Sequence, residues 1–172
     1  YNRYPDPLQQ KLKLRLSEVK GVQPQQIFLG VGSDECIDLV YRIFCEPAVD
    51  NVVAISPSYG MYEVCANINN VEYRTVSLNE NFELDLGRLF AATDEHTKAI
   101  WLCSPNNPTG NAFDPDMLAD VCRRFTGIVA IDEAYVNFSE RGSMLRRLAD
   151  LPNLIVMQTF SKAMASASVR LG

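Results

Sequence analysis

Short apolar runs alternate with amphipathic stretches along most of the chain. The apolar runs predict β-strands, and the stretches between them, where apolar residues recur at helical spacing, predict α-helices. The predicted strands are Val52–Ser56, Val71–Leu78, Ala99–Ser104, Ile128–Asp132 and Leu154–Phe160, and the predicted helices are Tyr59–Ile68, Leu84–Ala92, Pro115–Phe125 and Ser143–Ala149. Several runs are apolar throughout, as in strands buried on both faces. The alternation therefore predicts an α/β fold, a three-layer αβα arrangement with a mostly parallel central sheet.

The N-terminal part of the chain predicts two further helices and a short strand. Asp6 is the expected N-cap of the first helix, with Pro7 at the first helical position and Gln9 completing a capping box. The apolar face and the glycine stop of this helix are Leu8, Leu12, Leu16, Val19 and Gly21. The strand is Ile27–Gly32, and a second helix begins at Ser33 with one apolar side made of Ile37, Val40, Tyr41 and Phe44.

Length and charge narrow the class of protein. A chain of 172 residues is sized for one domain, and its 47% hydrophobic and 22% charged residues are ordinary for a globular protein. A formal charge of -5 argues against a broad electrostatic grip on nucleic acid or on an anionic membrane. No apolar run approaches the length of a membrane span, and no signal-peptide pattern opens the chain. We therefore expect a cytoplasmic protein.

The cysteines and the single histidine suggest neither disulfides nor a metal site. The five cysteines are odd in number and lack Cys-x-x-Cys spacing, so we expect free thiols in a reducing compartment. His96 lies in a polar stretch without a second histidine, which predicts a surface position and no metal ligation.

Lys162 is the strongest candidate for chemistry. It follows the apolar run Leu154–Met157, and the carboxyl ends of strands face the crevice where open α/β sheets bind ligands. Partial desolvation there would make a neutral lysine amine available for Schiff-base chemistry. Asp132 ends the preceding buried strand. A lysine and an aspartate in these positions suit pyridoxal phosphate, whose aldehyde the lysine would hold and whose pyridinium nitrogen the aspartate would pair with.

Three other segments follow strands, and Arg170 lies eight residues past Lys162; each of the four has a structural alternative. Ser33 and Asp34 begin a helix whose N-terminus could bind a phosphate, or they could form a simple capped start. Asn107, in Ser104–Gly110, could donate to the phenolic oxygen of the cofactor, or the segment could be a plain turn. Tyr59 could stack on a planar ring or belong to the core or surface. Arg170 could bind a phosphate or be a solvated arginine.

An ATPase is the other class in which an acidic pair ends an apolar strand, as Asp132 and Glu133 do here. That class requires a Gly-x-x-x-x-Gly-Lys-Ser/Thr loop, and the chain has none. The pair is therefore better explained by the pyridoxal-phosphate hypothesis.

The ordered set of motifs resembles that of the fold-type I pyridoxal-phosphate aminotransferases, and is most similar to the histidinol-phosphate aminotransferases among them. The resemblance covers essentially the whole chain. It rests on Arg3–Pro7, Gly32–Glu35, Pro57–Tyr62, Ser104–Gly110, Asp132–Tyr135 and Thr159–Ala163.

The resemblance implies a role for each candidate residue. Lys162 would bind the cofactor covalently and shuttle the substrate proton, and Asp132 would keep the ring nitrogen protonated. The cofactor would also be bound by the amides of Ser33 and Asp34 and by Ser161 and Arg170 at its phosphate, by Asn107 and Tyr135 at its phenolic oxygen, and by Tyr59 at its ring face. Tyr4 would reach the phosphate in the neighbouring subunit of a homodimer.

The implied activity is amino-group exchange between L-histidinol phosphate and 2-oxoglutarate in histidine biosynthesis. Members of the family are longer than this chain, so residues 1–172 would form the large cofactor-binding domain, without the complete N-terminal arm and the C-terminal small domain. A threonine-phosphate decarboxylase would have a similar large domain. An inactive truncated domain that only dimerises or binds a partner is the alternative outside catalysis.

One segment departs from the family pattern. After the lysine the family usually has an aromatic-Gly-Leu-Ala-Gly run, whereas this chain has Met164-Ala165-Ser166-Ala167-Ser168-Val169. The spacing from Lys162 to Arg170 is kept. We expect the loss of both glycines to change how closely this backbone packs beside the cofactor.

Overall fold

The centre of the fold is a sheet of five parallel strands. The computed structural model describes residue 4 and residues 6–172, so Arg3 and Pro5 of the N-terminal motif lie outside the described residues. The strand order is β2-β1-β3-β4-β5, and every neighbouring pair is parallel. The strands are β1 Asn51–Ser56, β2 Glu72–Ser77, β3 Thr97–Cys103, β4 Ile128–Asp132 and β5 Leu154–Met157. The expected α/β fold with a parallel sheet is confirmed.

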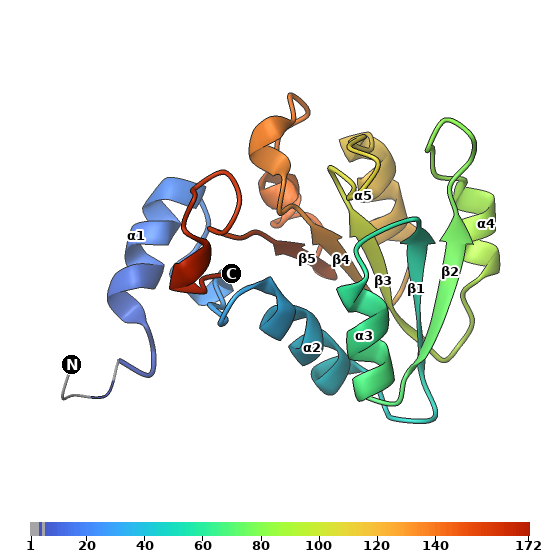
Figure 1. Cartoon of the computed structure of the whole chain (residues 1–172), viewed down its shortest axis with the longest axis horizontal. Coiled ribbons are helices and arrows are strands. Elements are labelled where there is room, and N and C mark those ends of the chain that lie inside the picture. Colours follow the sequence, from blue (N-terminus) through green and yellow to red (C-terminus); the bar gives the residue numbers. More distant parts are fainter. Residues whose placement is uncertain (1–3, 5) are drawn as a thin grey trace.

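Helices cover both faces of the sheet, which makes the three expected layers. Figure 1 shows α2 and α3 on one face and α4 and α5 on the other. The helices are α1 Gln10–Lys20, α2 Ser33–Phe44, α3 Met61–Ile68, α4 Leu86–Ala91 and α5 Pro115–Arg124, and four 3-10 turns are η1 Pro24–Gln26, η2 Val136–Phe138, η3 Met144–Arg147 and η4 Ala167–Val169. Within residues 4 and 6–172, no helix is long and apolar enough to cross a membrane.

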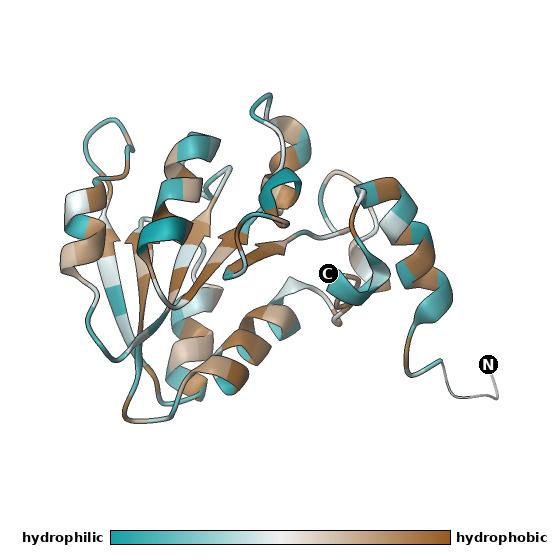
Figure 2. Ribbon diagram, turned by 180° about the vertical axis from the view of Figure 1, so that it is seen from behind, coloured by the Kyte–Doolittle hydropathy of each residue, from teal (hydrophilic) through white to brown (hydrophobic). Residues whose placement is uncertain are grey.

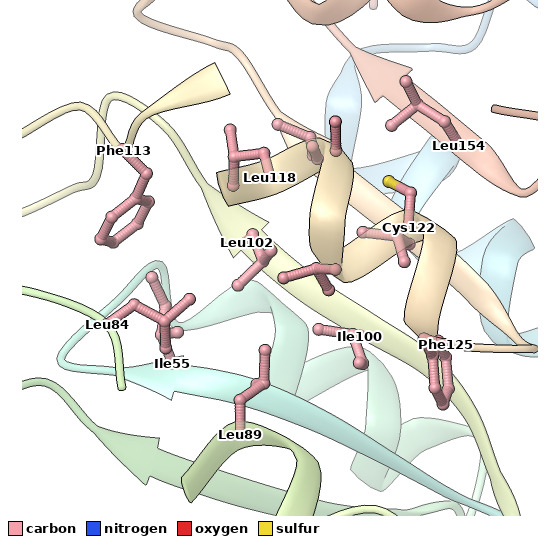
Figure 3. Packing of buried hydrophobic residues seen from close by; sticks show 14 of the residues in the cluster. Ile55, Leu84, Leu89, Ile100, Leu102, Phe113, Leu118, Cys122, Phe125 and Leu154 are labelled. Carbon is pink, nitrogen blue, oxygen red and sulfur yellow. The ribbon is translucent and has the colours of Figure 1, made fainter. Parts of the chain in front are cut away.

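Alternation along the central strands divides the core into two clusters. In β3, Ile100 and Leu102 point to the side of α4 and α5, whereas Ala99, Trp101 and Cys103 point to the side of α2 and α3. Figure 3 shows the first cluster, in which Leu89 of α4 and Leu118 of α5 pack over these strands. All of these side chains are buried, so the sheet is sealed on both faces and only its ends and edges are accessible.

The first helix differs from the prediction at its start and in its packing. It begins at Gln10, because Gln9 adopts a left-handed conformation with φ 54°. Asp6 still accepts hydrogen bonds from the N–H groups of Leu8 and Gln10, but in a turn that precedes the helix. Leu16 is the one residue of the expected apolar face that is buried, because α1 lies beyond β5 rather than over the sheet (Figure 1). The other apolar side chains of α1 remain exposed, and Figure 2 marks their positions along the helix in brown.

Three predicted elements are shorter or of another type. Ile27–Gly32 is not a strand, since only Val31 forms an isolated antiparallel bridge, to Leu171. The last strand ends at Met157 rather than Phe160. The predicted helix Ser143–Ala149 is reduced to the 3-10 turn η3, in which Ser143 accepts a hydrogen bond from the N–H of Leu145. In all three segments the apolar pattern is present, but it forms a shorter or more irregular element than the pattern predicts.

Candidate active site

A cavity of about 110 Å³ lies at the carboxyl ends of β3, β4 and β5. Parallel strands all end at the same edge of the sheet, so the segments that follow them meet there. The lining residues are Ser33, Asp34, Tyr59, Cys103, Asn107, Asp132, Ala134, Tyr135, Thr159, Ser161, Lys162 and Arg170. Every candidate from the sequence except Tyr4 is among them. Tyr4 is fully exposed and lies outside this lining.

Asp132 is the buried acid of the cavity. It is 3% exposed, and its Oδ2 accepts a hydrogen bond from the hydroxyl of Tyr62 at 2.7 Å. Its Oδ1 accepts a second hydrogen bond, from the N–H of Ala134 at 3.0 Å. Burial raises the pKa of the Asp132 carboxyl, whereas the hydrogen bond from Tyr62 lowers it. The carboxylate is thus held in a fixed orientation in an environment that disfavours its charge.

Tyr59 is fixed between the phosphate-binding candidates and the buried acid. Its hydroxyl donates to Oδ1 of Asp34 at 3.0 Å, and its ring meets that of Tyr62 edge to face, with centroids 5.7 Å apart. Burial and the hydrogen bond to Asp34 raise the pKa of Tyr59 to about 12. The phenol therefore stays neutral near pH 7, and its ring is held in one orientation.

The adjacent residues Asn106 and Asn107 have different roles in the loop after β3. The buried Asn106 donates to the carbonyl of Pro57 at 2.9 Å and accepts from the hydroxyl of Ser58 at 2.9 Å. These bonds tie the loop after β3 to the loop after β1. Asn107, next in the chain, lines the cavity instead. The segment is therefore a turn, as one reading of the sequence predicted, and this turn places Asn107 at the cavity.

The N-terminus of α2 and Arg170 meet at Gly32. Gly32 has φ 81°, and a Cβ atom placed on it would overlap the guanidinium of Arg170. No side chain caps the first turn of α2, which begins with Ser33 and Asp34. Gly172 exchanges backbone hydrogen bonds with Gly30, at 2.9 and 3.3 Å, which brings the end of the described chain beside this helix. Unpaired N–H groups and a guanidinium on one side of a cavity favour a bound anion.

Lys162 lies on a loop beyond β5, and its surroundings differ from the expectation. Its Nζ is 5.5 Å from the centroid of the Tyr135 ring, which is cation–π range. The residue is exposed, whereas the sequence argument expected partial desolvation. The difference arises because β5 ends at Met157, so Lys162 lies five residues past the sheet rather than at its rim.

Glu133 points away from the cavity, although it follows Asp132 directly. Its carboxylate accepts hydrogen bonds from Ser143 at 2.5 Å, from the N–H of Met144 at 2.6 Å and from Gln158 at 2.8 Å. Because successive side chains at a strand end alternate, Asp132 serves the cavity while Glu133 ties the ends of β4 and β5 together. Burial raises the pKa of the Glu133 carboxyl, and these donors oppose that rise.

Four further residues contribute to the site and are not among the candidates from the sequence: Tyr62, Cys103, Ala134 and Thr159. Cys103 and Thr159 line the cavity, and each sits at the end of a predicted strand. Tyr62 does not line the cavity, but it contacts the Asp132 carboxylate. Its role depends on a contact with Asp132, 70 residues away, so a local sequence pattern could not reveal it.

A larger cavity of about 330 Å³ lies between β5 and residues 27–29, and it does not contain the candidate residues as a group. Its lining is mostly aliphatic and aromatic, with Lys20 its single charged residue.

Among the described residues, no group of three or more His, Cys, Asp or Glu side chains is placed to hold a metal ion. All five cysteines are free thiols, as expected, and burial raises the pKa of Cys103 to about 12.

Comparison with known proteins identifies the family. The pattern of the family described as "Aminotransferase class I and II" matches residues 1–172. The chain belongs to the class I and II aminotransferases. It is 60% identical over 172 residues to the histidinol-phosphate aminotransferases of Bacteroides thetaiotaomicron and Parabacteroides distasonis, covering 100% of this chain and 50% of each relative. The chain thus spans about half the length of the curated relatives it matches.

The fold is shared with a solved member of this aminotransferase family. The crystal structure of histidinol-phosphate aminotransferase from Sinorhizobium meliloti, in complex with pyridoxal-5'-phosphate, matches with a TM-score of 0.88 at 27% identity. The match covers 98% of this chain and 47% of that one. The resemblance inferred from the motifs is therefore confirmed at the level of family and fold.

Replacing Asp132 with Asn should stabilise the protein near neutral pH in the absence of added ligand. The folded-state pKa is raised above the ordinary value of 3.8, so above pH 3.8 the folded state binds more protons than the unfolded state and stability falls as pH rises. Asp132→Asn removes that loss, so the variant should be more stable than the wild type at pH 7. Urea unfolding between pH 4 and 8 measures the difference in the free energy of unfolding between Asp132→Asn and the wild type. The gap between variant and wild type should narrow toward pH 4, and a gap that widens there would contradict the assignment.

Replacing Ala165 with Gly should also stabilise the protein. Ala165 has φ 48°, a left-handed conformation that a glycine adopts without steric cost, and it stands where the family run has its first glycine. We expect a gain of about 1 kcal/mol in the free energy of unfolding. The neighbouring exposed Ala163 is the matched control, since Ala163→Gly should lose about 0.5 kcal/mol. Equal effects of the two substitutions in a denaturant titration would refute the explanation.

Proposed function

We propose that residues 1–172 form the large, cofactor-binding domain of a histidinol-phosphate aminotransferase. The activity would be pyridoxal-phosphate-dependent exchange of an amino group between L-histidinol phosphate and 2-oxoglutarate. The observation that carries the proposal is the cavity in which Lys162, Asp132 and Arg170 come together at one edge of the sheet. The names of relatives that are 60% identical support the choice of substrate.

The residues around the cavity fit pyridoxal phosphate at both of its polar ends. At Gly32 the absence of a Cβ leaves room for the Arg170 guanidinium beside the uncapped start of α2, which suits a phosphate. At the other side, the buried Asp132 carboxylate has two neutral hydrogen-bond donors, and among the described residues it forms no ion pair. A protonated pyridine nitrogen is the kind of partner that this carboxylate requires.

Each residue would then have a defined task. Ser161, Arg170 and the amides of Ser33 and Asp34 would hold the phosphate. The remaining contacts would come from Asn107 and Tyr135 at the phenolic oxygen, from Tyr59 at the ring face and from Asp132 at the ring nitrogen. When bound, the cofactor supplies a conjugated, positively charged ring that withdraws electrons from the α-carbon of the substrate.

The lysine would carry the proton transfer. Lys162 would hold the cofactor covalently and, as a free amine once the substrate is bound, would take the proton from the substrate α-carbon and deliver it to C4′ of the cofactor. The Tyr135 ring, 5.5 Å from Nζ, would orient the amine. Asp132 would hold a proton on the ring nitrogen throughout, because its own hydrogen bonds to Tyr62 and Ala134 keep it in place.

We propose that the protein acts as a cytoplasmic homodimer and that Tyr4 belongs to the partner's site. Tyr4 lies outside the cavity of its own chain and is fully exposed, so its hydroxyl is free to reach another subunit. The expected contact is with the phosphate in the neighbouring cavity.

Reduction with borohydride after addition of pyridoxal phosphate tests the site. We expect a pyridoxyl group on the peptide that contains Lys162, found by mass spectrometry of the digested protein. The label should be lost in Lys162→Ala, because the nucleophile is removed. Lys20→Ala is the control, since Lys20 bonds to Gln158 outside the cavity and its loss should leave the label in place. Labelling of Lys162→Ala at the wild-type level would contradict the proposal.

An assay of the complete protein tests the reaction. With L-histidinol phosphate and 2-oxoglutarate we expect glutamate to form, and Asp132→Ala should slow this by at least a hundredfold, because the ring nitrogen loses its counter-ion. Release of carbon dioxide from threonine phosphate, without glutamate, would instead indicate the decarboxylase. A dimer that carries the label but turns over neither substrate would favour the binding-domain alternative.

A further inference from the structure

Tyr62 contacts Asp132, the buried acid of the site, from the core rather than from the cavity. Its hydroxyl donates to Oδ2 of Asp132 at 2.7 Å, and the two residues lie 70 positions apart in the chain. The Tyr62 side chain is fully buried and is not part of the cavity lining. It therefore reaches the carboxylate from inside the core, where it cannot compete with a ligand for the cavity.

The surrounding core fixes the position of the Tyr62 ring. It stacks on Trp101 with centroids 4.9 Å apart and planes 13° apart, and Tyr41 stacks on Trp101 at 5.8 Å. The carbonyl of Tyr62 accepts a hydrogen bond from the Tyr41 hydroxyl at 2.7 Å. Its other side meets the edge of the Tyr59 ring. Moving the Tyr62 phenol away from Asp132 would therefore displace the rings packed against it.

The groups that face Asp132 show why one hydrogen bond has a large effect there. Burial and the charge of Asp34 on α2 disfavour ionisation, whereas Tyr62 on α3, the N–H of Ala134 and the charge of Lys162 favour it. Cys103 on β3 stays neutral because burial raises its pKa to about 12. Tyr62 itself stays protonated, since burial and the Asp132 charge raise its pKa far above the ordinary value. It is therefore a permanent donor.

We propose that Tyr62 is a positioning residue of the site, whose hydroxyl keeps the Asp132 carboxylate ionised and aimed at the ring nitrogen of the bound cofactor. The inference rests on the proposed function, because the ring nitrogen belongs to pyridoxal phosphate. Tyr62 touches neither the substrate nor the cofactor. It acts through Asp132. Its side chain also contacts Tyr59, the residue proposed to stack on the cofactor, so Tyr62 connects Tyr59 with Asp132.

The pH titration of visible absorbance in the holoenzyme tests this role. A protonated ring nitrogen withdraws electrons from the rest of the bound chromophore. The separate proton whose loss changes the visible absorbance therefore leaves at a lower pH than it would beside a neutral ring nitrogen. In Tyr62→Phe the carboxylate is less well stabilised, and the absorbance midpoint should rise by about one pH unit, the effect of one lost hydrogen bond to a charged group. The value of kcat should fall about tenfold, with KM nearly unchanged, since one pKa unit corresponds to a factor of ten.

Tyr41→Phe is the matched control. Tyr41 is a buried tyrosine on the same Trp101, but its hydroxyl bonds to a backbone carbonyl rather than to Asp132. Loss of that hydroxyl should lower stability and leave the absorbance midpoint where it is. If both variants shift the midpoint equally, or if Tyr62→Phe shifts nothing while the wild type titrates, the positioning role is wrong. If the wild type gives no pyridoxyl group on Lys162, the proposed function fails first and this role fails with it.

A second substitution keeps the test valid if Tyr62→Phe does not fold. Replacing Tyr62 with 3-fluorotyrosine preserves the ring and makes the phenol a stronger donor, so the midpoint should move below that of the wild type. The same replacement at Tyr41 should not move it. An unchanged midpoint with 3-fluorotyrosine at position 62 would overturn the proposal.

Discussion

The burial of one carboxylate governs how the site is built. Asp132 ends β4, which lies between β3 and β5, so its side chain cannot reach bulk water by a small movement. An ionised carboxylate in such a place costs several kcal/mol unless donors surround it. The hydroxyl of Tyr62 and the N–H of Ala134 supply part of that compensation, and the cavity supplies the place for a cation. The Tyr62 ring in turn belongs to the stack of Tyr41, Trp101 and Tyr62 on this side of the core.

The loops around the cavity are held to one another rather than each by itself. Asn106 joins the loop after β3 to the loop after β1, and Glu133 joins the end of β4 to η3 and to Gln158. Lys20 extends the second connection to α1 through its bond to Gln158 at 2.6 Å. Because a sheet buried on both faces is rigid, these connections transfer its rigidity to the residues that face the cavity. Positions such as Asn107 can then be precise although they lie on loops.

Much of this organisation could be read from the sequence, because parallel sheets carry a strong local signal. The runs Val52–Ile55, Ala99–Cys103 and Ile128–Ile131 within β1, β3 and β4 are apolar throughout. Their alternation with helical patterns predicted both the layers and the edge where the candidate residues meet. Ile27–Gly32 failed because an apolar run forms a strand only when backbone partners are present, and here the bridge from Val31 to Leu171 is isolated. The role of Tyr62 could not be predicted from the sequence, because it depends on a contact with a residue 70 positions away, which no local pattern encodes.

The loop from Phe160 to Leu171 shows which part of the family pattern the geometry requires. The N–H of Phe160 donates to the carbonyl of Leu171, and its own carbonyl accepts from the N–H of Ser166, so the loop is closed by its own backbone. The closed loop carries both Lys162 and Arg170 to the cavity. Ala165 and Arg170 occupy left-handed conformations within it, at φ 48° and 53°. The chain thus tolerates alanine where glycine would be unstrained, at a cost of about 1 kcal/mol, whereas a change of spacing would move Arg170 away from Gly32. Spacing is the stricter constraint, because one short loop places both the lysine and the arginine of the site.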